Sequence, residues 1–147
     1  MLGDHGLMAK MNFYRSSVRV PLIMRPPGGT NGRVETEPVQ AFDVAATLLD
    51  AGTATALDGA PSRSLVTLVT GGGGTARRHA VSMIRMRPRL PTWQAITDGQ
   101  WRATFNADTG EVSELFDLVA DPDEVTNRAS DPSAGDESVR LRGLLAS

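Results

Sequence analysis

The feature that most constrains the fold is a set of short runs rich in β-branched and aromatic residues in the second half of the chain. The runs span residues 79–86, 92–97, 101–106 and 111–118. Asp98-Gly99 separates two of them, and this dipeptide is typical of a tight hairpin turn. The pattern predicts an antiparallel meander. Because the apolar side of such a sheet must be covered, we expect the amphipathic stretch at 138–146 to form a helix that packs on it.

The first half of the chain offers fewer elements. Residues 18–24 are apolar and β-branched, which predicts a strand, and helices are expected over 38–52 and 64–70. One strand and two helices are too few to close an α/β layer. We therefore expect residues 1–75 to be the incomplete end of an α/β domain, and residues 76–147 to be an antiparallel-sheet subdomain with a terminal helix.

Composition excludes several classes of function. The formal net charge is −2 and the sequence pI is near 5.6, so bulk charge attracts neither nucleic acid nor an anionic membrane. No apolar run approaches the roughly 20 residues that a membrane span needs. Cysteine is absent, which excludes disulfides and thiolate chemistry within this chain. We expect no nucleic-acid or membrane partner, and the absence of a visible signal peptide favours a cytoplasmic location.

Residues suited to chemistry gather in the first ten positions. Gly3 and Gly6 flank Asp4-His5, and Lys10 is the single lysine among 15 basic residues. A lysine ammonium is a compact point charge, unlike the planar fork of arginine. Asp4 and His5 could contact a metal ion, but two ligands on one loop are too few for a stable site. We expect no metal site on this chain alone.

Three blocks, in order, resemble the sulfatases of the alkaline-phosphatase superfamily. The first block is LGDHGLMAKMNFYRSSVRVPL, which matches the family pattern Leu-Gly-(Asp/Glu)-(His/Arg)-Gly-Leu-x-x-Lys followed by Val-Arg-Val-Pro-Leu. The second is FDVAATLLDAG with SRSLVTLVTG, and the third runs from ITDGQW to ELFDLVADPDEVTN, where relatives read Asp-Pro-x-Glu and then Asn. The resemblance implies an α/β fold of the alkaline-phosphatase type, of which this chain is the C-terminal portion.

The family hydrolyses sulfate esters with a formylglycine nucleophile and a calcium-type divalent cation. The resemblance implies that Lys10 contacts a sulfate oxygen of a small sulfate ester substrate and that His5 lines the substrate pocket. The Cys/Ser-x-Pro-x-Arg motif that yields formylglycine is absent here, and the metal-binding Asp and His of the family would precede Met1. We therefore expect Met1 to be an internal methionine, the isolated chain to be inactive, and the chain to associate with an N-terminal part.

Two alternatives stay open at the level of sequence. A phosphonate monoester or phosphodiester hydrolase of the same superfamily shares the Gly-Asp-His pattern followed by Lys. A non-catalytic binding module folded around the C-terminal meander is the alternative from another class.

Overall fold

The computed structural model describes residues 1–29, 32–52, 61–72, 77–85 and 90–145. It divides into two compact units: Met1–Val20 together with His79–Ser147 form unit 1, and Pro21–Arg78 form unit 2. The domain boundary expected between residues 75 and 76 stays a prediction.

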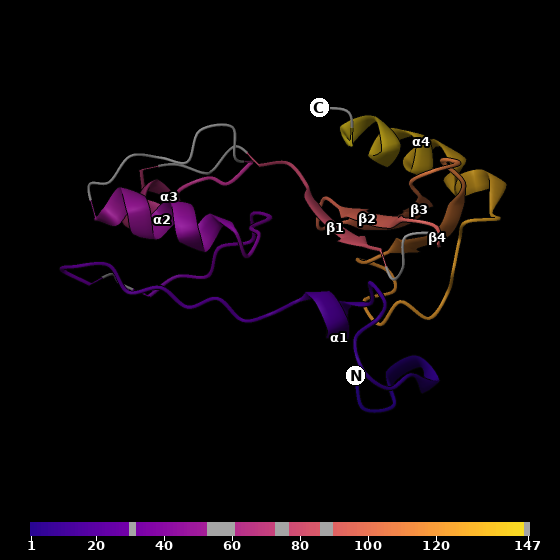
Figure 1. Cartoon of the computed structure of the whole chain (residues 1–147), viewed down its shortest axis with the longest axis horizontal. Coiled ribbons are helices and arrows are strands. Elements are labelled where there is room, and N and C mark those ends of the chain that lie inside the picture. Colours follow the sequence, from indigo (N-terminus) through magenta and orange to yellow (C-terminus); the bar gives the residue numbers. More distant parts are fainter. Residues whose placement is uncertain (30–31, 53–60, 73–76, 86–89, 146–147) are drawn as a thin grey trace. The chain divides into compact units, whose positions relative to one another are not determined.

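The meander predicted from the turn signals is confirmed in unit 1. Its strands are β1 (Ala80–Ile84), β2 (Trp93–Thr97), β3 (Trp101–Asn106) and β4 (Val112–Asp117). They pair antiparallel in the order β1-β2-β3-β4, as Figure 1 shows. At the β2–β3 turn the Asp98 carboxylate accepts the backbone N–H groups of Gln100 and Trp101 at 2.9 and 2.8 Å, and Gly99 adopts φ +92°. This conformation is one that glycine adopts without steric cost.

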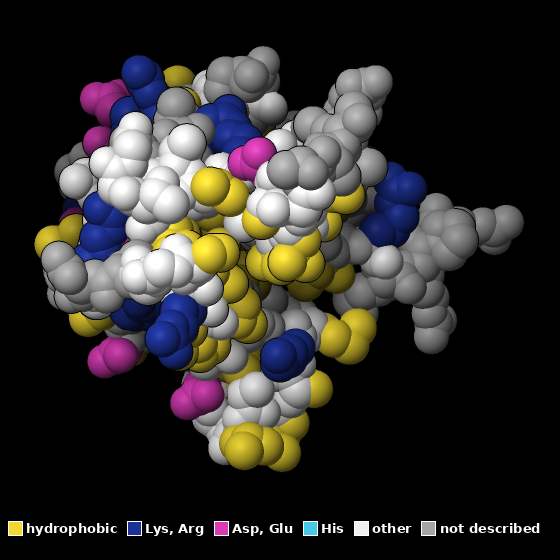
Figure 2. Space-filling view, turned by 90° about the vertical axis from the view of Figure 1, so that its left-hand side faces the viewer, with side chains coloured by type: hydrophobic (Ala, Val, Ile, Leu, Met, Phe, Trp, Pro, Cys, Tyr) yellow, Lys and Arg dark blue, Asp and Glu magenta, His cyan; other side chains and the backbone are white. Residues whose placement is uncertain are grey.

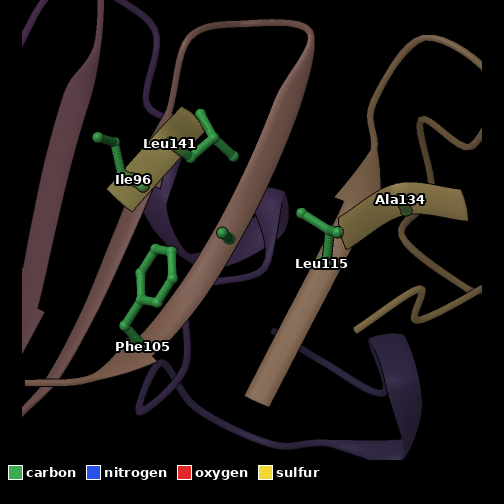
Figure 3. Close-up of a cluster of buried hydrophobic side chains, with 6 residues drawn as sticks. Ile96, Phe105, Leu115, Ala134 and Leu141 are labelled. Carbon is green, nitrogen blue, oxygen red and sulfur yellow. The ribbon is translucent and has the colours of Figure 1, made fainter. Parts of the chain in front are cut away.

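One face of the sheet packs against the C-terminal helix α4 (Gly135–Leu144), which follows the 3-10 turn η2 (Pro132–Ala134). The buried side chains there form one hydrophobic cluster, drawn in Figure 3. Its members are Ile96, Ala103, Phe105, Leu115, Ala134 and Leu141. Sequence alternation explains the cluster, since cross-strand partners such as Ile96, Ala103 and Leu115 lie on the same side of the sheet. The expected packing of a terminal helix on the meander is confirmed.

The opposite face of the sheet is also covered. It carries Arg102, Thr104 and Phe116, which are 4%, 4% and 2% exposed. The N-terminal segment of unit 1, with the 3-10 turn η1 (Asp4–Gly6) and the short helix α1 (Arg15–Val18), lies on the side of the sheet away from α4 (Figure 1). The meander is therefore the middle layer of unit 1.

Unit 2 contains two helices, α2 (Asp43–Ala51) and α3 (Val66–Thr70), among its described residues. Thr47 of α2 joins them, because its hydroxyl accepts the backbone N–H of Leu65 at 2.9 Å. The strand predicted over 18–24 is wrong: Val18 ends α1, and the residues after it form neither helix nor strand. The local pattern suited a strand, but no described strand pairs with this segment.

The face of α2 that is buried is polar. Asp43 and Thr47 are 0% and 3% exposed, whereas Val44 and Leu48 are 37% and 68% exposed. The space-filling view of Figure 2 shows exposed hydrophobic side chains beside arginine and carboxylate side chains. Within the described part of the chain, no helix is both long enough and apolar enough to cross a membrane.

Candidate functional site

The first ten residues form a closed loop with an unusual backbone. Leu2 and Met8 pair in an isolated antiparallel bridge, and the Gly3 N–H donates to the Leu7 carbonyl at 3.0 Å. His5 has φ +53° and Ala9 has φ +71°, a region that side chains beyond glycine rarely occupy. Such conformations persist where the surroundings fix them, and they concentrate at functional sites.

Lys10 lies at the end of this loop. Hydrogen bonds fix its backbone, whereas its side chain is free. Its carbonyl accepts the Asn12 N–H at 2.7 Å and the Ser17 hydroxyl at 2.8 Å. The side chain is exposed, and it makes no hydrogen bond or ion pair with any residue that the structure describes. An ammonium with no carboxylate partner is available to bind an anionic ligand.

His5 lies on the other side of the loop and is held by an aromatic contact. Its ring stacks on that of Tyr14, with centroids 3.8 Å apart and planes 11° apart. His5 also adds the smallest of the effects that lower the pKa of Asp121, after the Thr126 and Val125 amides that the carboxylate accepts. The structure thus places His5 beside the turn that follows β4. No hydrogen bond joins the side chains of His5 and Lys10 among the described residues.

Tyr14 connects the loop to the sheet, and the sequence analysis did not single it out. Burial is the largest cause that raises its pKa, and the Glu114 carboxylate adds to the effect, while Arg102 opposes it. The Arg102 guanidinium lies 5.3 Å from the centroid of the Tyr14 ring and 4.7 Å from that of Phe116. Glu124, which also raises the pKa of Tyr14, is the glutamate of the motif Asp-Pro-x-Glu. The motif is visible in the sequence, but it does not specify which residues this glutamate contacts.

Neither the cation nor the nucleophile implied by the family fits the described residues. No group of three or more histidine, cysteine, aspartate or glutamate side chains is arranged there to hold a metal ion. Formylglycine has no precursor motif in the sequence. Among the described residues, the His5–Lys10 loop presents an exposed imidazole and an exposed ammonium.

A shallow hollow of about 390 Å³ lies elsewhere in unit 1, beside the start of β2 and the end of β3. Neither His5 nor Lys10 lines it. Its lining residues are Arg85, Leu90, Pro91, Thr92, Asn106, Asp108 and Thr109.

Comparison with known proteins identifies the class to which this fold and loop belong. The choline-sulfatase of Rhizobium meliloti (strain 1021) is 37% identical over 133 residues, covering 90% of this chain and 25% of that protein. A crystal structure of a sulfatase from Bacteroides thetaiotaomicron VPI-5482 superposes with a TM-score of 0.80 at 22% identity, covering 92% of this chain and 30% of that one. The phosphonate monoester hydrolase of Agrobacterium radiobacter superposes with a TM-score of 0.60 at 22% identity, covering 71% of this chain and 23% of that one.

The architecture is that of the C-terminal portion of a sulfatase with the alkaline-phosphatase-like fold, as the resemblance implied. The chain belongs to the family described as "N-sulphoglucosamine sulphohydrolase, C-terminal", whose pattern matches residues 3–146. It spans about a quarter of the length of the choline-sulfatase that it matches.

Proposed function

We propose that this chain supplies the C-terminal portion of a sulfuric ester hydrolase and that Lys10 contacts a sulfate oxygen of the substrate. The observation that carries the proposal is the Lys10 ammonium, exposed and unpaired among the described residues, at the end of a loop with a fixed backbone. An ammonium placed at an anionic oxygen stabilises the charge that develops there during ester cleavage. His5, on the same loop, would contact the substrate beside it.

The rest of the catalytic machinery is proposed to lie outside this chain. The divalent cation and formylglycine that the family implies would come from an N-terminal part, with which this chain associates. The exposed apolar face of α2 supports that association, because Val44 and Leu48 are 37% and 68% exposed in the described part of the chain. A small sulfate ester is the proposed substrate.

The test is a chimera in which residues 3–146 replace the matched quarter of the Rhizobium meliloti choline-sulfatase. Hydrolysis of 4-nitrophenyl sulfate is measured for the chimera and for its Lys10→Met variant. Removal of one charge-stabilising donor lowers kcat by about 10²–10³-fold in other enzymes. We expect a loss of that order for Lys10→Met and a smaller loss for Lys10→Arg, which keeps the charge but changes its shape.

The matched control is Arg25→Gln, which removes one exposed positive charge at another position. It should leave the rate within about twofold, since an exposed charge with no proposed substrate contact is screened by salt. A Lys10→Met chimera with a rate equal to that of the Arg25→Gln chimera would remove Lys10 from the site.

The structural likeness to a phosphonate monoester hydrolase favours one second candidate. The two esters carry the same single negative charge but differ in shape, because a phenyl group on phosphorus replaces one of the sulfate oxygens. The ratio of rates on 4-nitrophenyl sulfate and on 4-nitrophenyl phenylphosphonate therefore separates the candidates. For a sulfatase we expect the sulfate to react faster. Faster reaction of the phosphonate would select the second candidate and leave the role of Lys10 as an anion-binding group unchanged.

A further inference from the structure

We propose that Glu124, paired with Arg102, is a positioning residue for Lys10, because it fastens the start of α1 to the face of the sheet opposite α4. The functional part of this inference rests on the proposed role of Lys10 in binding sulfate. The structural part concerns contacts within unit 1 and can be tested on the chain alone.

Glu124 joins two segments that are far apart in the sequence. It is 2% exposed, and it has φ +56°, a backbone conformation that glutamate rarely adopts. One carboxylate oxygen accepts from Nε of Arg102, and the other accepts the backbone N–H of Arg15 at 2.6 Å, across 109 positions of sequence. Both oxygens are therefore occupied, one by the sheet and one by the N-terminal segment.

We call the contacts of Glu124 with Arg102 and with the Arg15 N–H the junction. Arg102 makes further contacts at this junction. It is 4% exposed, and Nη1 donates to the Thr104 hydroxyl at 2.8 Å and to the Glu114 carboxylate at 2.9 Å. The central carbon of its guanidinium lies over the Tyr14 ring, 5.3 Å from the ring centroid. Consecutive residues, Tyr14 and Arg15, thus both contact the Arg102–Glu124 pair.

A short chain of contacts leads from this junction to Lys10. The Tyr14 N–H donates to Oδ1 of Asn12 at 3.1 Å, and the Asn12 N–H donates to the Lys10 carbonyl at 2.7 Å. The hydroxyl of Ser17, in α1, reaches the same carbonyl at 2.8 Å. The backbone of Lys10 is therefore fixed by residues that the junction holds, whereas its ammonium stays free to meet a ligand. Glu124 acts on the position of the cation without touching the ligand.

The first experiment removes one donor and keeps the fold of the sheet. Arg15→Pro deletes the N–H that Glu124 accepts, at the first position of α1, where proline fits a helix. Tyr14 has φ −58° and ψ 149°, a conformation compatible with a following proline. Amide hydrogen exchange on the full 147-residue chain then reports the Val18 amide. We expect it to exchange at least about tenfold faster, the factor that a lost hydrogen bond to a charged group implies.

The matched control is Arg15→Gln, which loses the same side-chain charge but keeps the N–H. We expect no change in the exchange of Val18 in this variant, and no change in the β3 amides in either variant. Equal acceleration of Val18 and the β3 amides in Arg15→Pro would overturn the proposal, because the contact would then stabilise the whole of unit 1. Unchanged exchange of Val18 would overturn it as well.

A second readout is the ionisation of the only tyrosine in the chain, followed by phenolate absorbance. The pKa of Tyr14 is raised, first by burial and then by Glu114. Arg15→Pro leaves the carboxylates of Glu114 and Glu124 in place, so a fall of this pKa toward about 10 reports release of the ring from the sheet. A merely stabilising contact would leave the Tyr14 pKa of the folded protein unchanged.

The functional part is tested by non-additivity in the choline-sulfatase chimera. If the junction acts through Lys10, Arg15→Pro lowers kcat/KM on 4-nitrophenyl sulfate, and adding it to Lys10→Met causes little further loss. Losses that multiply in the double variant would overturn the positioning role. If the chimera without substitutions turned over no sulfate ester, the proposed function would fail, while the exchange and phenolate results would still decide whether Glu124 holds the segment.

Discussion

Truncation of Leu141 tests the packing on which unit 1 depends. Leu141 is 0% exposed, and it packs from α4 into the cluster of Ile96, Ala103, Phe105 and Leu115 (Figure 3). Leu-to-Ala changes in cores cost about 2–5 kcal/mol, and the cost is larger where the surroundings cannot collapse into the cavity. Three of these neighbours lie on paired strands held by backbone hydrogen bonds on both sides, so we expect a loss of about 3–4 kcal/mol.

That loss is a large part of the free energy of unfolding of unit 1. Domains have about 0.05–0.15 kcal/mol of stability per residue, which gives about 4–13 kcal/mol for a unit of about 90 residues. Both tryptophans, Trp93 and Trp101, lie in the sheet, so urea unfolding followed by tryptophan fluorescence reports this unit. Val139→Ala is the matched control on the same helix: Val139 is 70% exposed, and we expect a change within about 0.5 kcal/mol. A Leu141→Ala loss below about 1 kcal/mol would refute the placement of α4 on the sheet.

Three further predictions concern two glycines and the acid stability of unit 1. Gly135→Ala should stabilise unit 1 by about 0.5–1 kcal/mol in urea unfolding, because Gly135 is helical and its added Cβ meets no atom within 4 Å. Gly99→Ala should instead destabilise it by about 1–2 kcal/mol, because Gly99 has φ +92°. The Ser133 hydroxyl, and then the Arg128 guanidinium, lower the pKa of Asp131 to about 2. The stability that this group contributes is complete above its unfolded pKa of about 4 and is lost as the pH falls toward 2. Asp131→Asn should therefore flatten the decline of the urea midpoint between pH 4 and pH 2, and an unchanged decline would contradict the assignment.

Local pattern was sufficient to predict the meander and the terminal helix, because alternation and turn residues act over a few positions. It was insufficient for the second face of the sheet. In β3 the alternation of WRATFN assigns Arg102 and Thr104 to a polar face, and polar faces of antiparallel sheets commonly meet water. The structure buries both residues under a segment that precedes them by about 90 positions. No local signal specifies a contact at that separation.

The same limit applies to α2. Apolar side chains of a surface helix usually face the core, yet in α2 Asp43 and Thr47 are buried while Val44 and Leu48 are exposed. Asp43 accepts the N–H groups of Gln40 and Arg63 at 2.8 and 2.9 Å, so a carboxylate is stable there because its bonds are supplied. The apolar side chains of Val44 and Leu48 stay partly exposed in the described part of the chain.

Two motifs that lie far apart in the sequence meet in the candidate site: the N-terminal sulfatase motif and the Asp-Pro-x-Glu motif, which are joined through Glu124. A buried ion pair adds little net stability compared with an apolar pair of the same volume, since desolvation offsets its attraction. Its hydrogen bonds are directional, however, and a hydrophobic contact is not. At the position of the Arg102–Glu124 pair, an ion pair or an apolar pair would each cover the sheet. Only a carboxylate, with its two oxygens, can accept hydrogen bonds from both a guanidinium and the Arg15 amide. The choice of charged residues there is explained by the orientation that they impose on the segment leading to Lys10.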